Sequence, residues 1–417
     1  MPILAGSLAP RLEADAELSM ERIRADLLQV GAPIPFDVYN SEGRLLLRRG
    51  HMVESEVQLE RLLQTGRYDP DSAEAHAARS AQAGRVVQEF SRLPSQSARN
   101  RVSIFERLTE AAHALDALRS LTPPAPGFEA GVRAVVANIR ECCALDSDAA
   151  LAQIMISTSL GYSLRHSTNA AILASLLLNR LHHDAGRSES AVAAALTMNL
   201  AIFDLQNTLY RQQEPLTPEQ RMALRLHPGE STRRLRAFGV EDPVWLQAVE
   251  QHHEARDGSG YPAALKEPAI CREAQIVSLA DRYCVLVSDR AYRPALAPRR
   301  AIKELHDRAA NAIEPALIGA LIAAVGLFPP GAYVRLANGE TAIVVRRLLD
   351  PKHPTVYALH QDTTAPYETP KKRLTGSHRD YEITGDVKPE AVRTKIDPET
   401  LWPPTAVGDA AAAGTSA

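Results

Sequence analysis

Residues 126–326 are helical in pattern nearly throughout, and this stretch constrains the fold more than any other feature of the sequence. Its apolar residues recur at helical spacing in segments that glycine, proline and polar turns separate, and no pair of strand-like runs interrupts them. The longest nearly apolar run, 191–203, contains Thr197 and Asn199 and falls well short of the roughly 20 residues that a bilayer requires. We therefore expect an all-α domain in which this run is a buried helix, and no membrane span.

Regions with β character lie on both sides of the helical stretch. Residues 36–53 alternate around a Ser-Glu-Gly turn and predict a β-hairpin, and the next residues, from Ser55 to Gly66, carry the start and stop signals of a short helix. After the helical stretch, two β-rich runs around Asn338-Gly339 predict a second hairpin. The expected fold is therefore mainly α, with a small N-terminal α+β module and a C-terminal β-rich cap.

Changes in composition set the expected boundaries between these parts. Residues 69–100 are rich in alanine, serine, glutamine and arginine and have almost no bulky apolar side chain, and the end of the chain lacks residues that form a core. We expect an N-terminal helix at 1–29, the α+β module at 30–70, a linker at 71–104, the helical domain at 105–327, the β-rich cap at 328–387 and a disordered tail at 388–417.

The bulk composition excludes several classes of protein. A net charge of -3 and a pI near 6.5 argue against nucleic-acid binding, which requires a basic surface for the phosphates. The four cysteines form no CxxC pair, and the first residues lack the charged and apolar regions of a signal peptide. We therefore expect a cytoplasmic protein with free thiols and no nucleic-acid partner.

The densest chemical signal is the string from His252 to Pro262. Two adjacent histidines stand where a helical segment ends, and they enter a glycine-rich loop that a proline fixes. Consecutive imidazoles on a helix point in different directions, so both can bind one metal ion only if the helix ends there. A surface pair before a turn is the plainer interpretation, and it is the one that suits His182-His183.

The whole string, HHEARDGSGYP, fits the pattern HHExxDGxGYP at every fixed position. That pattern is the signature of the HD-GYP family of bacterial cyclic di-GMP phosphodiesterases, which this chain resembles over about 105–345. The resemblance implies an HD-domain-like helical bundle, a metal centre and cyclic di-GMP as the ligand. It also implies the metal ligands, which would be His166, His227, His252, His253 and Asp281.

The pair of residues that gives the family the first half of its name is missing. In the family a His-Asp pair precedes the Leu of an LT step, and counting back 18 residues from Leu216 leads to Met198, followed by Asn199. The Lys that comes next in the family is Ile202 here. The thioether of Met198 suits soft metal ions, and the neutral Asn199 is a weak ligand that cannot bridge two divalent cations. The resemblance thus predicts a degenerate active site with no intact catalytic residues.

The remaining ligands fall into two groups. One metal position would keep His166 and Asp281, while the other would keep His227, His252 and His253 but lose its anion. Three histidines can hold a zinc ion with one position open. We expect either one divalent transition metal ion (Zn, Fe or Mn) or none, in which case the histidines pack or hydrogen-bond within a closed pocket.

The loop and a nearby basic cluster form the expected binding surface. Glycines let the backbone of the loop approach a partner, and the tyrosine offers a stacking face with a polar tip. Arg290 and Arg293 are candidate phosphate contacts, although a run of charge is more often solvated surface. The loop residues expected to contact a ligand or a partner protein are Glu254, Asp257, Gly258, Gly260, Tyr261 and Pro262.

These features favour a non-hydrolytic regulator of cyclic di-GMP signalling, which binds the nucleotide or a partner protein through the pocket and the loop. A first alternative is an active cyclic di-GMP phosphodiesterase with a depleted metal site. A second alternative is an interaction scaffold without any ligand. Metal content separates the enzyme from the other two, and nucleotide binding separates the regulator from the scaffold.

Overall fold

The computed structural model divides into two compact units, Met1–Arg85 and Val86–Ala417. Each unit has its own hydrophobic core. The residues that the structure describes are 20–23, 27–69, 72–75, 77–78, 81, 101–125, 127–157, 160–308, 312–361, 366–394 and 396–406.

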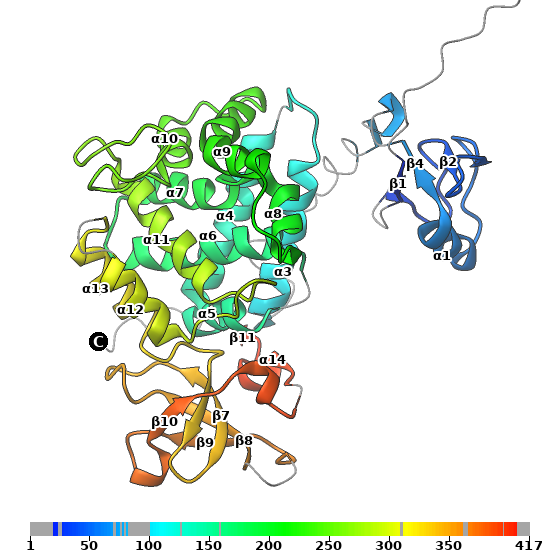
Figure 1. Ribbon diagram of the computed structural model, residues 1–417. Helices are drawn as coiled ribbons and strands as arrows, with labels where there is room; N and C mark the ends of the chain where they lie inside the picture. Colours follow the sequence, from blue (N-terminus) through cyan, green and yellow to red (C-terminus); the bar gives the residue numbers. More distant parts are fainter. Residues whose placement is uncertain are drawn as a thin grey trace, which may run out of the picture. The chain divides into compact units, whose positions relative to one another are not determined.

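The first unit contains a four-stranded antiparallel sheet and helix α1 (Glu56–Thr65) (Figure 1). The hydroxyl of Ser55 caps this helix by accepting a hydrogen bond from the Gln58 amide, and the helix ends at Gly66, where a Cβ would clash with the backbone of Leu62. The predicted hairpin and helix are confirmed. In the order β1-β4-β2-β3, the strands are β1 (Glu21–Arg22), β4 (Arg67–Tyr68), β2 (Val38–Tyr39) and β3 (Leu45–Leu47).

The predicted N-terminal helix at 1–29 is wrong where the structure describes it. Glu21–Arg22 form strand β1, which pairs with β4. Ile23, Leu27 and Leu28 enter the core of the small unit, so apolar residues that fit helical spacing are used here to cover a sheet. The structure does not describe residues 1–19, 24–26 or 82–100. The last of these ranges is most of the linker predicted at 71–104.

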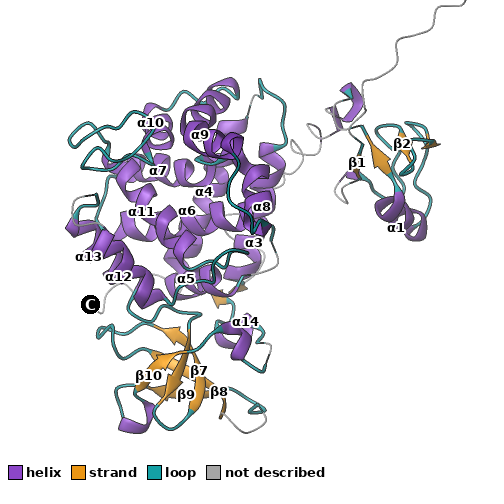
Figure 2. Ribbon diagram, viewed as in Figure 1, coloured by secondary structure: helices purple, strands orange, loops and turns teal. Residues whose placement is uncertain are grey.

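The second unit is a helical bundle built around α6 (Tyr162–Arg180), as expected from the sequence (Figure 2). Helix α6 is buried along most of its length and packs against α4, α7 and α11, because alanines and serines on its faces allow close approach. Among the described residues, no helix is both long enough and apolar enough to cross a membrane. The other helices are α3 (Ile104–Arg119), α4 (Phe128–Leu145), α5 (Ser147–Ile156), α7 (Ala185–Thr197), η2 (Leu200–Ile202), α8 (Phe203–Arg211), α9 (Pro218–Ala237), α10 (Pro243–Gln251), α11 (Arg272–Leu286), α12 (Pro298–Arg308) and α13 (Pro315–Val325).

A five-stranded antiparallel sheet follows the bundle and confirms the predicted β-rich cap. Its central hairpin turns at Gly339, whose positive φ of 82° suits glycine. One face of the sheet joins the core of the bundle through Ile343, Val345 and Leu359, and the other face has a small core of its own. In the order β10-β6-β7-β8-β9, the strands are β10 (Ile383–Asp386), β6 (Tyr333–Leu336), β7 (Glu340–Arg346), β8 (Thr355–Gln361) and β9 (Lys371–Leu374).

The prediction that the chain is disordered from 388 onward is wrong for the residues described there. Helix α14 (Pro398–Leu401) leads to Trp402, which is 2% exposed and donates from Nε1 to the carbonyl of Val345 at 3.0 Å. Strand β11 (Thr405–Ala406) then pairs with β5 (Arg101–Val102), within the predicted linker. Trp402 and Leu401 are buried in the core of the bundle, and Val392 and Ile396 pack against it, so these few apolar residues fix the segment. Residues 407–417 lie outside the described residues.

Candidate metal centre and ligand cavity

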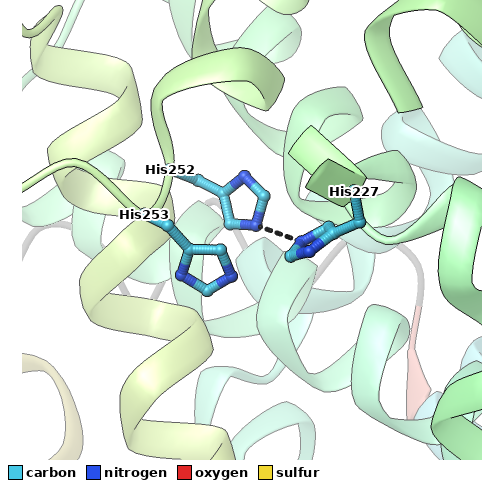
Figure 3. Close-up of side chains that lie close together, drawn as sticks. All are labelled: His227, His252 and His253. Carbon is cyan, nitrogen blue, oxygen red and sulfur yellow. Dashed lines mark hydrogen bonds between the residues drawn. The ribbon is translucent and has the colours of Figure 1, made fainter. Parts of the chain in front are cut away.

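Helix α10 ends at the two adjacent histidines, which is the condition for both of them to bind one metal ion. Gln251 is its last residue and His252 is the C-cap, so the backbone turns between the two imidazoles. The third histidine, His227, comes from α9, which begins at the capping box of Thr217. Figure 3 shows the three imidazoles converging from these two elements. Their nitrogen ligand atoms lie within 4.8 Å of one another.

Backbone carbonyls fix the tautomers of two of these histidines. Nδ1 of His227 donates to the Leu224 carbonyl at 2.7 Å, and Nδ1 of His252 donates to the Val249 carbonyl at 2.6 Å. The two Nε2 atoms therefore face each other at 3.2 Å (Figure 3). In neutral imidazoles each of these atoms carries a lone pair and no proton, so a cation between them would satisfy both.

The electrostatic setting keeps the three imidazoles uncharged. Burial, with a smaller contribution from His252, lowers the pKa of His227 to about 3. Burial also lowers the pKa of His252 and lowers that of His253 well below its usual range. Neutral imidazole is the form that binds metal ions. The three histidines therefore fit one divalent metal ion of the Zn, Fe or Mn type.

His166 and Asp281 form a separate pair beside these histidines. Nε2 of His166 on α6 lies 2.8 Å from Oδ1 of Asp281 on α11, and both side chains are buried. Burial alone would raise the pKa of Asp281, but the hydrogen bond and charge of His166 outweigh it and hold that pKa well below its usual range. Nε2 of His166 and Oδ1 of Asp281 bond to each other without a metal ion, while the buried Nδ1 of His166 has no partner among the described residues.

A cavity of about 550 Å³ opens beside both groups. His227, His253 and Asp281 line it, as do Asn199 and Ile202. The structure thus brings two of the three positions matched to the missing His-Asp pair and Lys to the candidate centre. Met198, the third, does not line the cavity and packs in the main hydrophobic core.

The loop after α10 is held by its own acidic residues. The carboxylate of Glu254 accepts from the amides of Ala263 and Leu265 at 2.7 and 2.9 Å. Asp257 accepts from the amide and hydroxyl of Ser259 at 2.9 and 2.6 Å, and it is exposed. These contacts fix the shape of the loop and leave its tip open to solvent.

The GYP residues place an aromatic ring over the histidines. Gly258 has a positive φ of 82°, and a Cβ at Gly260 would clash with the backbone at Glu254. The ring of Tyr261 stacks on His253, with centroids 4.7 Å apart, and lines the cavity. Pro262, joined to Tyr261 by a cis peptide bond, is exposed.

The two candidate phosphate contacts, Arg290 and Arg293, have different hydrogen-bond partners. Arg290 lines the cavity, donates to the hydroxyl of Tyr162 and lies 4.2 Å from the centroid of that ring. Arg293 instead donates to the carbonyls of Leu286 and Val285 at the end of α11, and it does not line the cavity. A basic residue near the C-terminal end of a helix can donate to backbone carbonyls that have no partner within the helix. A count of charges along the sequence does not reveal this role.

Sequence reasoning missed one wall of the cavity. Gln206 and Leu209 on α8 line it, together with residues 212–216 of the loop before α9. Apart from Leu216, the Leu of the LT step, these residues belong to no motif of the resemblance. The signal that was available is their spacing, since Asn199, Ile202, Gln206 and Leu209 follow one another at intervals of three and four residues.

This helical bundle, with histidines and an aspartate beside one cavity, is similar to a known protein family. The HD domain family matches residues 151–317, a range that contains all five candidate ligands. This part of the chain is therefore similar to an HD domain.

Curated relatives narrow the class. The chain is 25% identical over 225 residues to the cyclic di-GMP phosphodiesterase PA4108 of Pseudomonas aeruginosa, covering 53% of this chain and 54% of that protein. It is 25% identical over 187 residues to the cyclic di-GMP phosphodiesterase PdeB of Borreliella burgdorferi, covering 45% and 49%. The chain is thus a distant homologue of the HD-GYP cyclic di-GMP phosphodiesterases and spans about half the length of these relatives.

A solved structure is also similar. Bd1817, an HDG"Y"P protein from Bdellovibrio bacteriovorus, has 18% sequence identity and a TM-score of 0.47, covering 73% of this chain and 98% of that chain.

Proposed function

We propose that this chain is a degenerate HD-GYP protein that binds a cyclic dinucleotide, or a partner protein beside it, without hydrolysing the nucleotide. The observation that supports this most is the composition of the cavity wall. Asn199 and Ile202 line the cavity where the resemblance places an aspartate and a lysine. A neutral amide and an aliphatic side chain leave the ligand pocket in place but remove the charges that the reaction uses.

Two-metal hydrolysis requires an anion that bridges the ions and fixes their spacing. Asp281 and Glu214 are the carboxylates among the residues that line the cavity. Asp281 is already engaged by His166, and Glu214 is exposed at the rim. A second ion would have to compete with His166 for Asp281, so we expect no more than one tightly bound ion.

That one ion would be held by His227, His252 and His253, and when bound it would polarise a phosphate oxygen of the ligand. The remaining contributions come from the chain itself. Tyr261 offers an aromatic face to a base, and Arg290 offers a cation to a phosphate. These groups support binding of a nucleotide phosphodiester.

One observation favours a second candidate, an enzyme that still cleaves a phosphodiester with a single metal ion. Catalytic zinc sites use three protein ligands and leave a position open for water. The three histidines stand beside a cavity in the same way. The two candidates bind the same ligand and differ in turnover.

The deciding experiment measures metal content, cyclic di-GMP affinity and cyclic di-GMP turnover on the purified chain. We expect one ion or fewer per chain, measurable binding, and no turnover when Mn or Fe is added. His252→Ala should lose the ion, while the matched control His113→Ala, at an exposed histidine on α3, should retain it.

Other outcomes are equally clear. Turnover that disappears in His252→Ala would establish the single-metal enzyme. Two tightly held ions would place an unrecognised ligand in the centre. A chain that binds neither metal nor cyclic di-GMP would be the ligand-free scaffold.

A further inference from the structure

Gln206 is an unexplained polar residue in the wall of the cavity. It lies on α8 and lines the cavity. Its side-chain oxygen Oε1 is enclosed, and it has no hydrogen-bond partner among the residues that the structure describes. Enclosed polar atoms without partners are rare in native proteins, because they lose water and gain nothing in return. A ligand that fills the cavity would supply the missing partner.

The surroundings of Gln206 are apolar on its own helical face. Ile202 precedes it by four residues and Leu209 follows it by three, and both line the cavity. Val285 of α11 and Leu224 of α9 line the cavity as well. An amide flanked by aliphatic side chains on its own helical face is suited to a flat aromatic ring with a polar edge.

The cavity holds a second unsatisfied group of opposite chemistry. Arg290 lines the cavity, and its Nε is enclosed without a partner. A simple anion would satisfy Arg290 and leave Gln206 unpaired, whereas a neutral heterocycle would do the reverse. A nucleotide carries both an anionic phosphate and a base edge, so it alone of these three would satisfy both residues.

We propose that Gln206 is a specificity-determining residue that pairs with the hydrogen-bonding edge of a purine base, while Arg290 faces the phosphate. This inference rests on the proposed function and adds the part of the ligand that is recognised. An amide presents an acceptor and a donor side by side, and purines present matching donor and acceptor groups. Pairing would satisfy Oε1 without any change in the charge of the cavity.

The test measures the affinity of the full-length chain for cyclic di-GMP and cyclic di-AMP. Gln206→Met keeps the volume and removes both hydrogen bonds, so affinity should fall about 10- to 100-fold. Gln206→Glu offers two acceptors, which suit the adjacent N–H groups of guanine and repel the ring nitrogen of adenine. Its cyclic di-GMP affinity should stay within about 3-fold of wild type, while cyclic di-AMP affinity falls at least about 10-fold.

Two controls separate recognition from damage to the fold. Gln247→Met alters an exposed glutamine on α10 that is not among the residues lining the cavity, and its affinity should stay within about 2-fold of wild type. Without ligand, Gln206→Met should melt at the wild-type temperature or above it, because an unpaired amide is removed. A residue with only a structural role would lower that temperature.

Wild-type affinity in Gln206→Met, or an equal loss in Gln247→Met, would overturn the inference and leave the proposed function standing. A wild-type chain that binds neither dinucleotide would overturn both.

Discussion

The two halves of the candidate centre satisfy their polar atoms in different ways. In the first half, His227 and His252 point Nε2 atoms at each other across 3.2 Å, and burial keeps them uncharged. In the second half, His166 and Asp281 bond to each other at 2.8 Å. In the first half two lone pairs face each other, and a cation would satisfy both. In the second half the facing nitrogen and oxygen bond to each other, while Nδ1 of His166 has no partner among the described residues.

Under the proposed function, this difference corresponds to a metal site of which one half is retained. When an anionic ligand disappears, the groups that remain must pair with each other or stay available for an ion. An imidazole and a carboxylate can pair, whereas the facing Nε2 atoms of His227 and His252 cannot, because their fixed tautomers make both of them acceptors. The half without a carboxylate therefore has nitrogen atoms available for an ion, whereas in the other half the facing atoms bond to each other.

The largest expected effect comes from restoring the missing residues. The triple change Met198→His, Asn199→Asp and Ile202→Lys supplies an imidazole, a bridging anion and a cation. We expect bound metal to rise from one ion to two per chain and cyclic di-GMP hydrolysis to rise by about 100-fold or more. Elemental analysis and a turnover assay measure both.

Stability provides a second measurement of the same variant. A buried carboxylate and ammonium without metal are costly, so the triple variant should unfold more easily in chelator and recover when Mn, Fe or Zn is added. Ile202→Lys alone is the matched control, because it adds charge without adding ligands. A triple variant that responds to neither chelator nor metal would mean that the second half never held an ion.

The sequence predicted the elements of this centre better than their contacts. Three local predictions are confirmed: the end of α10 at His252, the hairpin at Gly339 and the start of α1 after Ser55. Each depends on turn or cap chemistry within a few residues. The ligand positions required the resemblance, because histidines from α9 and α10 meet only after the chain has folded.

Other features depend on contacts between distant residues, and the sequence did not reveal them. Trp402 packs near Val345, and Arg293 bonds to carbonyls at the end of α11. Gln206 matters because apolar residues of other helices surround it. No local pattern distinguishes these side chains from solvent-exposed ones.

A smaller effect is expected from breaking the pair in the second half. Asp281→Asn removes the charge that His166 contacts while it keeps the shape of the side chain. Removing one partner of a buried ion pair costs about 3–5 kcal/mol, so the free energy of unfolding at pH 7 should fall by that amount in chelator. Urea unfolding followed by circular dichroism measures this loss.

The matched control is Asp257→Asn, which changes an exposed aspartate and should cost less than about 0.5 kcal/mol. If Asp281→Asn cost as little as the control, the second half would not be held by its own ion pair, and the contrast between the halves would fail.

The smallest expected effect is a change of stability with pH that comes from Glu273, a residue of α11 outside the candidate centre. Glu273 lies about two turns before Asp281 and belongs to neither half. Its carboxylate is fully buried, bonds to Arg187 at 2.6 and 2.9 Å, and bonds to His183 at 2.8 Å. Burial alone would raise the pKa of Glu273, but the bonds from Arg187 outweigh it, so the pKa lies below the ordinary value of 4.5.

A lowered pKa fixes the direction of the pH dependence. Above pH 4.5 the carboxylate is ionised in both folded and unfolded chains, and its stabilisation is fully present. As the pH falls below 4.5, the unfolded chain takes up the proton first, and the stabilisation is lost as the pH passes through the lowered pKa of the folded chain. Glu273→Gln should therefore lower the free energy of unfolding by about 1–2 kcal/mol at pH 7. The loss is modest because Arg187 is half exposed and solvent screens the pair. Below pH 4.5 the difference between the variant and the wild type should shrink. Urea unfolding at pH 7, 5, 4 and 3.5 measures the difference between wild type and Glu273→Gln. If this difference stays constant across these values, Glu273 is not a source of acid sensitivity.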